Sequence, residues 1–151
     1  MMAALQIKPY MLQSDDRSWL QAGGAQVCIA ASSEQTGGVF NLFDVACMPG
    51  YATALHIHYA EDVAIYVLAG TLTLFWGNEK KTASAGSYFF QPRGTPHGFQ
   101  VEGAAPARIL YLTYPAGFDR FVVEQGSLVP DLESASAAAW YKIEVLGALP
   151  D

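Results

Sequence analysis

The feature that most constrains the fold is a succession of short β-rich runs separated by turn residues, with no helical pattern between them. Glycine and proline pairs such as Gly37-Gly38, Pro49-Gly50 and Gly77-Asn78 interrupt the runs, as turn-forming residues do. Many short strands without intervening helices favour a sandwich or barrel over a parallel α/β sheet. The expected strands span residues 25–31, 39–47, 53–58, 63–69, 71–76, 87–91, 97–101 and 107–114. The fold class is therefore predicted to be all-β.

The last quarter of the chain changes to a helical pattern. Phe118, Phe121 and Val122 follow i, i+3, i+4 spacing, and Gly126 is a stop signal, so a helix is expected over about 117–126. A second helix is expected from about Leu132 to Tyr141, with Asp131 as its N-cap. Both helices are too short to be stable alone in water, so we expect them to pack on the barrel.

At 151 residues and 52% hydrophobic composition, the chain can bury the core of one ordinary domain. No linker or repeat divides it. We expect an N-terminal arm over 1–24, the barrel over 25–116 and a C-terminal helical segment over 117–151, all in one domain.

Charge argues against nucleic acid as a partner. The formal net charge is −6, and the densest basic spot, Lys80-Lys81, falls in an apparent hairpin turn. No apolar run reaches the roughly 18–20 residues that span a bilayer, so no membrane association is expected. Met1 to Lys8 lacks the pattern of a secretory signal, which predicts a cytoplasmic protein. Cys28 and Cys47 lie in apolar runs and are expected to be buried free thiols.

The chain's only three histidines form a spaced pattern. His56 and His58 alternate along one expected strand and therefore point to the same face. His97 follows the rigid turn Pro92-Arg93-Gly94-Thr95-Pro96. A single buried histidine is more often a hydrogen-bonded core residue, but three in this pattern predict one interior metal site. Neutral imidazoles suit a divalent transition metal (Fe, Ni, Zn, Mn or Cu), and acid below about pH 6 should release it.

The spacing also resembles that of a known family. Gly50-x5-His56-x-His58-x11-Gly70 resembles the first motif of the cupins, and Gly86-x5-Pro92-x-Gly94-x2-His97 resembles the second. Over about residues 25–126 the chain is similar to single-domain cupins of the quercetin-dioxygenase-like kind. The resemblance implies a cupin double-stranded β-helix, or jelly-roll barrel, with the metal ligands at its mouth. It also implies a homodimer, and Ile143 to Gly147 extends the similarity.

One position departs from the family pattern. The glutamate that completes the usual metal site, seven residues before the closing glycine, corresponds to Val63. Three interpretations stay open. Metal binds through three histidines and water, or Glu61 or Asp62 reaches in as a substitute carboxylate, or the site is an apolar ligand pocket without metal. Solvated turn positions are the more common role for Glu61 and Asp62.

Strand alternation predicts the lining of the pocket. Val63 and Ile65 share a face, and Phe99 has the same parity as His97. By resemblance, the leading function is a metal-dependent, dioxygenase-like oxidoreductase acting on a small phenolic or enolisable molecule. The alternatives are a non-enzymatic small-ligand-binding protein and a metal-assisted isomerase or lyase, since one fold hosts several chemistries. No residue is assigned as the catalytic acid or base.

Overall fold

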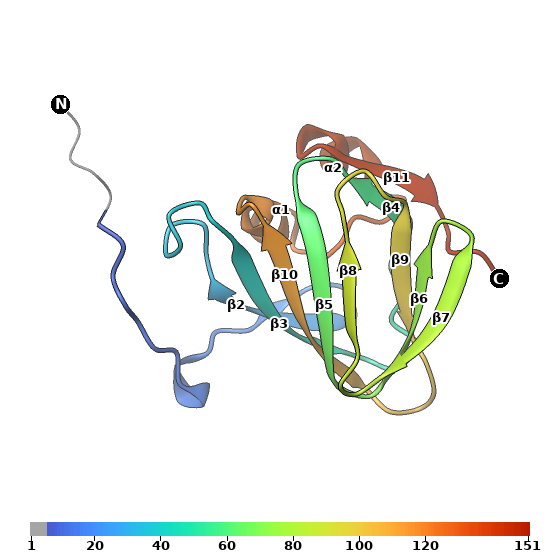
Figure 1. Cartoon of the computed structure of the whole chain (residues 1–151), viewed down its shortest axis with the longest axis horizontal. Helices are drawn as coiled ribbons and strands as arrows, with labels where there is room; N and C mark the ends of the chain where they lie inside the picture. The colour runs from blue at the N-terminus through green and yellow to red at the C-terminus, as the bar shows by residue number, and fades with distance from the viewer. Residues whose placement is uncertain (1–5) are drawn as a thin grey trace.

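Two antiparallel sheets pack face to face in the computed structural model, which describes residues 6–151 (Figure 1). Residues 1–5, where the segment assessed for a secretory signal begins, lie outside the described residues. The six-stranded sheet has the order β1(Leu20–Gln21), β2(Ala25–Ala31), β3(Asn41–Cys47), β10(Ala107–Tyr114), β5(Asp62–Ala69), β8(Tyr88–Gln91). The five-stranded sheet has the order β11(Ile143–Gly147), β4(Leu55–His58), β9(His97–Val101), β6(Thr71–Trp76), β7(Glu79–Ser84). A short 3-10 turn, Ser14–Asp16, precedes the first strand.

The core lies between the two sheets because each strand turns alternate side chains inward. On β10, residues 107, 109, 111 and 113 are buried, while the residues between them are more exposed. The inner faces interdigitate as in a jelly roll, which confirms the all-β prediction and its cupin-type architecture.

All eight expected runs contain a strand, and three further strands, β1, β7 and β11, lie outside them. Lys80 and Lys81 lie within β7, paired with Phe75 and Leu74, and not in a turn; the turn is at Gly77-Asn78. In β7 only Ala83 is buried, so this edge strand has no apolar alternation to detect. β11 lies in the segment that was expected to be helical.

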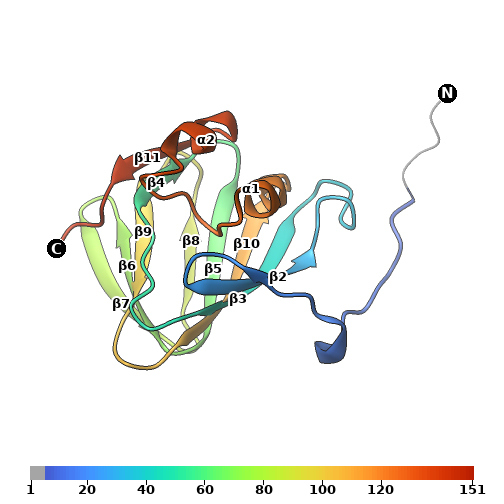
Figure 2. The same ribbon diagram turned by 180° about the vertical axis from the view of Figure 1, so that it is seen from behind.

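The C-terminal helices lie at one end of the barrel, with α2 beside β4 and β11 and α1 beside the end of β10 (Figures 1 and 2). Helix α1 spans Phe118–Gln125 and ends at Gly126, whose left-handed backbone and N–H to Val122 O bond confirm the stop signal. Helix α2 spans Ala135–Trp140, so Asp131 is not its N-cap. The Asp131 carboxylate instead accepts the Ser134 N–H at 2.8 Å, and Ser134 Oγ accepts the Asp131 N–H at 2.9 Å. These reciprocal bonds close a turn before the helix begins.

Two further expectations concern the cysteines and membrane-spanning helices. Cys28 and Cys47 are buried free thiols, as predicted. Within residues 6–151, no helix has both the length and the apolar character needed to cross a bilayer.

Candidate metal centre

Two loops cross between the sheets at the end of the barrel that carries the helices. β4 ends at His58, and the turn 59–61 leads to β5 in the opposite sheet. The loop 92–96 crosses in the same way from Gln91, the last residue of β8, to His97, the first of β9. The two loops are tied together, since Gly94 N–H donates to His58 O at 2.8 Å. They therefore place the ends of four strands around one point.

The three histidines converge at that point. His56 and His97 are directly paired across β4 and β9, and His58 follows on the same face of β4. The ring centroids are 4.5 Å apart for His56–His97, 5.0 Å for His56–His58 and 5.4 Å for His58–His97. The potential ligand atoms of all three lie within 4.8 Å of one another. The side chains are buried, with exposed fractions of 1%, 1% and 4%.

Hydrogen bonds fix which ring nitrogen faces the centre. His56 Nδ1 contacts Ala54 O at 2.7 Å, and His97 Nδ1 contacts Thr95 O at 2.9 Å. Because a carbonyl oxygen only accepts, Nδ1 carries the proton in both rings and Nε2 keeps its lone pair. His58 Nδ1 contacts the Glu61 carboxylate at 2.6 Å, which sets the same tautomer. All three Nε2 atoms are buried without a hydrogen-bond partner, and this donor set fits a transition-metal ion.

Burial keeps the imidazoles of His56 and His97 neutral. It lowers the pKa of His97 to about 3, with a further contribution from His58, against the opposing bond to Thr95. Burial also lowers the pKa of His56 well below its usual value, helped by His97 and His58. Neutral imidazole is the form that coordinates metal, so these rings are ready to bind at physiological pH.

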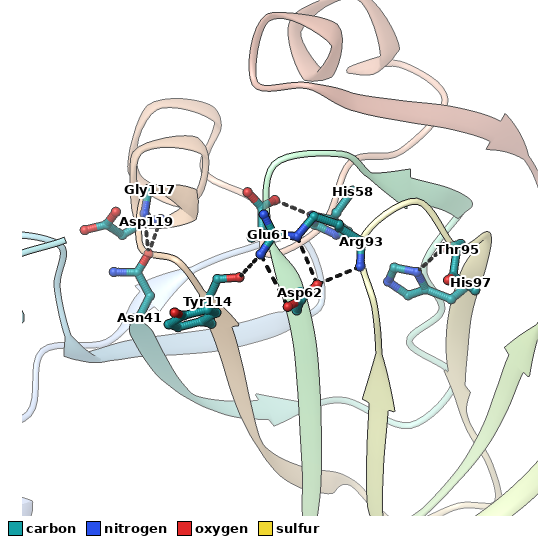
Figure 3. A network of polar contacts seen from close by, with 10 residues as sticks. All are labelled: Asn41, His58, Glu61, Asp62, Arg93, Thr95, His97, Tyr114, Gly117 and Asp119. Atoms are coloured by element: carbon teal, nitrogen blue, oxygen red, sulfur yellow. Dashed lines mark hydrogen bonds and ion pairs between the residues drawn. The ribbon is translucent and has the colours of Figure 1, made fainter. Parts of the chain in front are cut away.

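Glu61 and Asp62 point in different directions from the same turn (Figure 3). Glu61 is buried and bonds to the outer nitrogen of His58, so its carboxylate lies behind the ligand and not among the three Nε2 atoms. Asp62 accepts the Arg93 backbone N–H at 2.8 Å and the Arg93 Nε–H at 3.1 Å. These hydrogen bonds from Arg93 lower the pKa of Asp62. Asp62 thus links the two crossing loops.

The expected pocket-lining residues Val63, Ile65 and Phe99 are all buried, with exposed fractions of 1–2%, and belong to the core. Val63 takes the inward position on β5, as strand alternation requires. Its cross-strand neighbours are Gln91 on β8 and Thr113 on β10, which are also buried. Sequence analysis did not single out these two residues. The available signal was a polar side chain at an inward strand position.

Phe118, the first residue of α1, was also missed as a site neighbour. Its ring lies 5.0 Å from the His58 ring and stacks on Phe121 at 5.4 Å. A surface pocket of about 310 Å³ lies between the β4–β5 turn, α1 and the end of α2. Glu61 and Phe118 line this pocket and also contact His58. The helical spacing in the sequence identified Phe118 only as a packing residue.

Comparisons with known proteins agree with this architecture. Residues 43–113 match the model of the family described as "Cupin domain". The chain is 28% identical over 103 residues to a quercetin 2,3-dioxygenase of Bacillus subtilis (strain 168), covering 68% of this chain and 31% of that protein. It is 35% identical over 66 residues to an uncharacterized protein of Methanocaldococcus jannaschii, covering 44% of this chain and 53% of the relative. The chain therefore spans about a third and about half of the two relatives.

Among solved structures, the fold is similar to that of KdgF from Halomonas sp., with a TM-score of 0.66 and 23% identity. The alignment covers 74% of this chain and 99% of KdgF. At this level of identity the likeness shows a shared fold alone.

Proposed function

We propose that this chain, whose residues 43–113 match the cupin domain model, is a metal-binding protein with dioxygenase-like oxidoreductase activity on a small phenolic or enolisable molecule. The observation that carries the proposal is the set of three buried Nε2 lone pairs that converge on one point. Leaving buried polar atoms unpaired costs free energy, and a coordinated cation removes that cost. Similarity to a quercetin 2,3-dioxygenase supports the reaction class.

His56, His58 and His97 would hold the ion, which fits iron, nickel, zinc, manganese or copper. When bound, a transition metal supplies Lewis-acid polarisation of a substrate oxygen and, for redox-active ions, an electron path to O₂. The protein's own residues prepare the site. Glu61 fixes the orientation and tautomer of the His58 ring, and the Phe118 ring packs against His58.

A non-enzymatic ligand-binding role is the second candidate, and Val63 favours it. The usual glutamate of the cupin motif is an ionisable group at the centre, and valine supplies neither a ligand nor a proton acceptor. Under this alternative, metal and ligand bind but no substrate is consumed.

The test begins with metal content and calorimetric titration of the apoprotein with Ni(II), Fe(II) and Zn(II). We expect one site per chain, lost on His97→Ala. Glu61→Gln should weaken metal binding by about 10–100-fold, because partners behind a ligand tune its affinity to that extent. Glu79→Gln, which removes the same charge from an exposed strand, is the matched control and should leave affinity unchanged.

Oxygen consumption with flavonols and β-diketones then separates the two candidates. Turnover by the loaded protein that disappears in His97→Ala supports the oxidoreductase. Tight binding without oxygen uptake would support the binding role instead. Failure of the wild-type protein to bind any of the ions would contradict both.

A further inference from the structure

The inner face of the six-stranded sheet carries three buried polar side chains opposite the histidines. Gln91 on β8 pairs with Val63 on β5, which in turn pairs with Thr113 on β10. Tyr111 lies two residues before Thr113 and on the same face of β10. Exposed fractions are 1% for Gln91 and Tyr111 and 0% for Thr113. We call Gln91, Thr113 and Tyr111 the donor row.

Each member of the donor row has a polar atom without a partner. These atoms are Gln91 Nε2, Thr113 Oγ1 and Tyr111 Oη. An amide nitrogen only donates, and both hydroxyls can donate. Burial raises the pKa of Tyr111 well above its usual value, with Glu61 and Tyr51 adding to the effect, so the phenol keeps its proton. Three unpaired donors on one inner face are costly in a folded protein and point to a missing acceptor.

The two crossing loops place the donor row opposite the histidine cluster. Gln91 and His97 lie at the two ends of the loop 92–96, while His58 ends β4 before the turn 59–61 and Val63 is the second residue of β5 after it. All four side chains point into the space between the sheets, since all are buried at inward positions. The Tyr111 ring is 6.1 Å from Phe118, whose ring contacts His58.

Charge indicates the kind of acceptor. A divalent cation held by three neutral imidazoles keeps its full charge, because Val63 replaces the usual carboxylate. Glu61 compensates only part of that charge, from behind His58. Asp44, the other buried acidic side chain of residues 6–151, is already paired with Arg17 and Arg108. An uncompensated charge in an apolar interior favours binding of an anion.

We propose that the site takes a small organic oxyanion, a carboxylate or an enolate, whose oxygen atoms accept hydrogen bonds from Gln91, Thr113 and Tyr111 on the side opposite the histidines. The inference rests on the proposed metal binding and adds the residues that select the ligand. Gln91 is the main determinant, because its amide is carried on a long, flexible side chain and lies next to the position that lost its carboxylate.

The experiment uses the full chain loaded with Ni(II) or Zn(II). Calorimetry measures the binding of acetate and oxalate as carboxylate probes and of acetylacetonate as the enolate probe. We expect Gln91→Leu, Thr113→Val and Tyr111→Phe each to weaken anion binding by roughly tenfold or more, since hydrogen bonds to charged groups are among the stronger ones. Metal affinity should stay within about threefold of wild type, because none of these residues supplies a ligand.

Stability of the apoprotein distinguishes ligand binding from a structural role. Removing an unpaired donor should leave the melting temperature unchanged or raise it, whereas removing a structural hydrogen bond lowers it. Thr73→Val is the matched control: this buried hydroxyl on β6 bonds to Glu102 at 2.6 Å, so its loss should lower the melting temperature without affecting anion binding. Gln91→Glu should abolish anion binding and tighten metal binding, because it supplies the negative charge within the protein.

The outcomes separate the two proposals. A wild-type protein that takes up no metal overturns the proposed function and this inference with it. Metal uptake with no anion binding, or with anion binding unaffected by the three substitutions, overturns the inference alone. Donor-row variants that lose apoprotein stability as Thr73→Val does would also overturn it. Preference for the carboxylate or the enolate probes identifies which oxyanion the site selects.

Discussion

Val63 is the residue whose identity most affects the proposed metal centre. It is buried at an inward position of β5, where the first cupin motif has a glutamate. Val63→Glu is expected to tighten Fe(II), Mn(II) or Ni(II) binding by at least about 10-fold, because even partners behind a ligand change affinity by about 10–100-fold. In the apoprotein the same carboxylate is buried without a compensating positive charge, which should cost several kcal/mol.

Calorimetric metal titration and melting curves of apo and loaded protein measure these two effects separately. Val63→Leu, which changes size without adding a ligand, is the control. If Val63→Glu leaves both metal affinity and apoprotein stability unchanged, the side chain at position 63 does not face the histidines.

Among the elements, the β5–β6 connection depends on Gly70, the closing glycine of the first motif. Its φ is +82°, and a Cβ there would lie 2.7 Å from both Ala107 Cα and Pro106 O. These are backbone atoms of β10 and the loop before it, so they cannot move aside as a flexible side chain would. Gly70→Ala should therefore lower the free energy of unfolding by about 2–4 kcal/mol, from backbone strain plus the clash.

Gly86→Ala is the matched control, because Gly86 also has a positive φ of +93° but no neighbouring atom within 4 Å of the position that a Cβ would take. Its cost should be limited to the conformational strain of about 1 kcal/mol. Chemical denaturation of both variants gives the comparison. Equal losses would mean that the contact with β10 contributes nothing to the requirement for glycine at position 70.

For the whole molecule, the buried titratable groups predict acid sensitivity of the apoprotein. The folded-state pKa of His97 is lowered from 6.5 to about 3, and that of His56 is also lowered. The unfolded chain therefore binds more protons, and stability is lost as the pH falls from about 6.5 toward 3. Each such histidine costs about 1.4 kcal/mol per pH unit inside that window.

Asp44 contributes at lower pH. Burial alone would raise its pKa, but hydrogen bonds and charge from Arg108 and Arg17 outweigh this effect and lower it below 3.8. Its contribution is present above about 3.8 and is lost as the pH falls through the lowered value. Urea denaturation of apo wild type and His97→Gln between pH 7 and 4 tests the histidine effect. The variant should show a shallower pH dependence, and identical slopes would contradict this account.

The homodimer that the family resemblance implies stays a prediction.

The sequence by itself determined the strand-dominated class and the convergence of the three histidines. Alternation placed His56 and His58 on one face, because this depends only on local backbone geometry. The spacing of His97 after its rigid turn predicted the third ring, and the pairing of β4 with β9 brings it to the other two. Local patterns were also sufficient for the stop at Gly126 and for the inward position of Val63.

Only the tertiary structure decided what surrounds the histidines. That Glu61 bonds to His58 Nδ1, that Phe118 contacts the His58 ring, and that Gln91 and Thr113 flank Val63 follow from pairings between distant segments. The edge strand β7 lacks an apolar pattern, and β11 becomes a strand only by pairing with β4. Periodicity reports which face of an element is buried, but which residue lies opposite depends on sheet order and loop crossings, and these are set by packing of the whole chain.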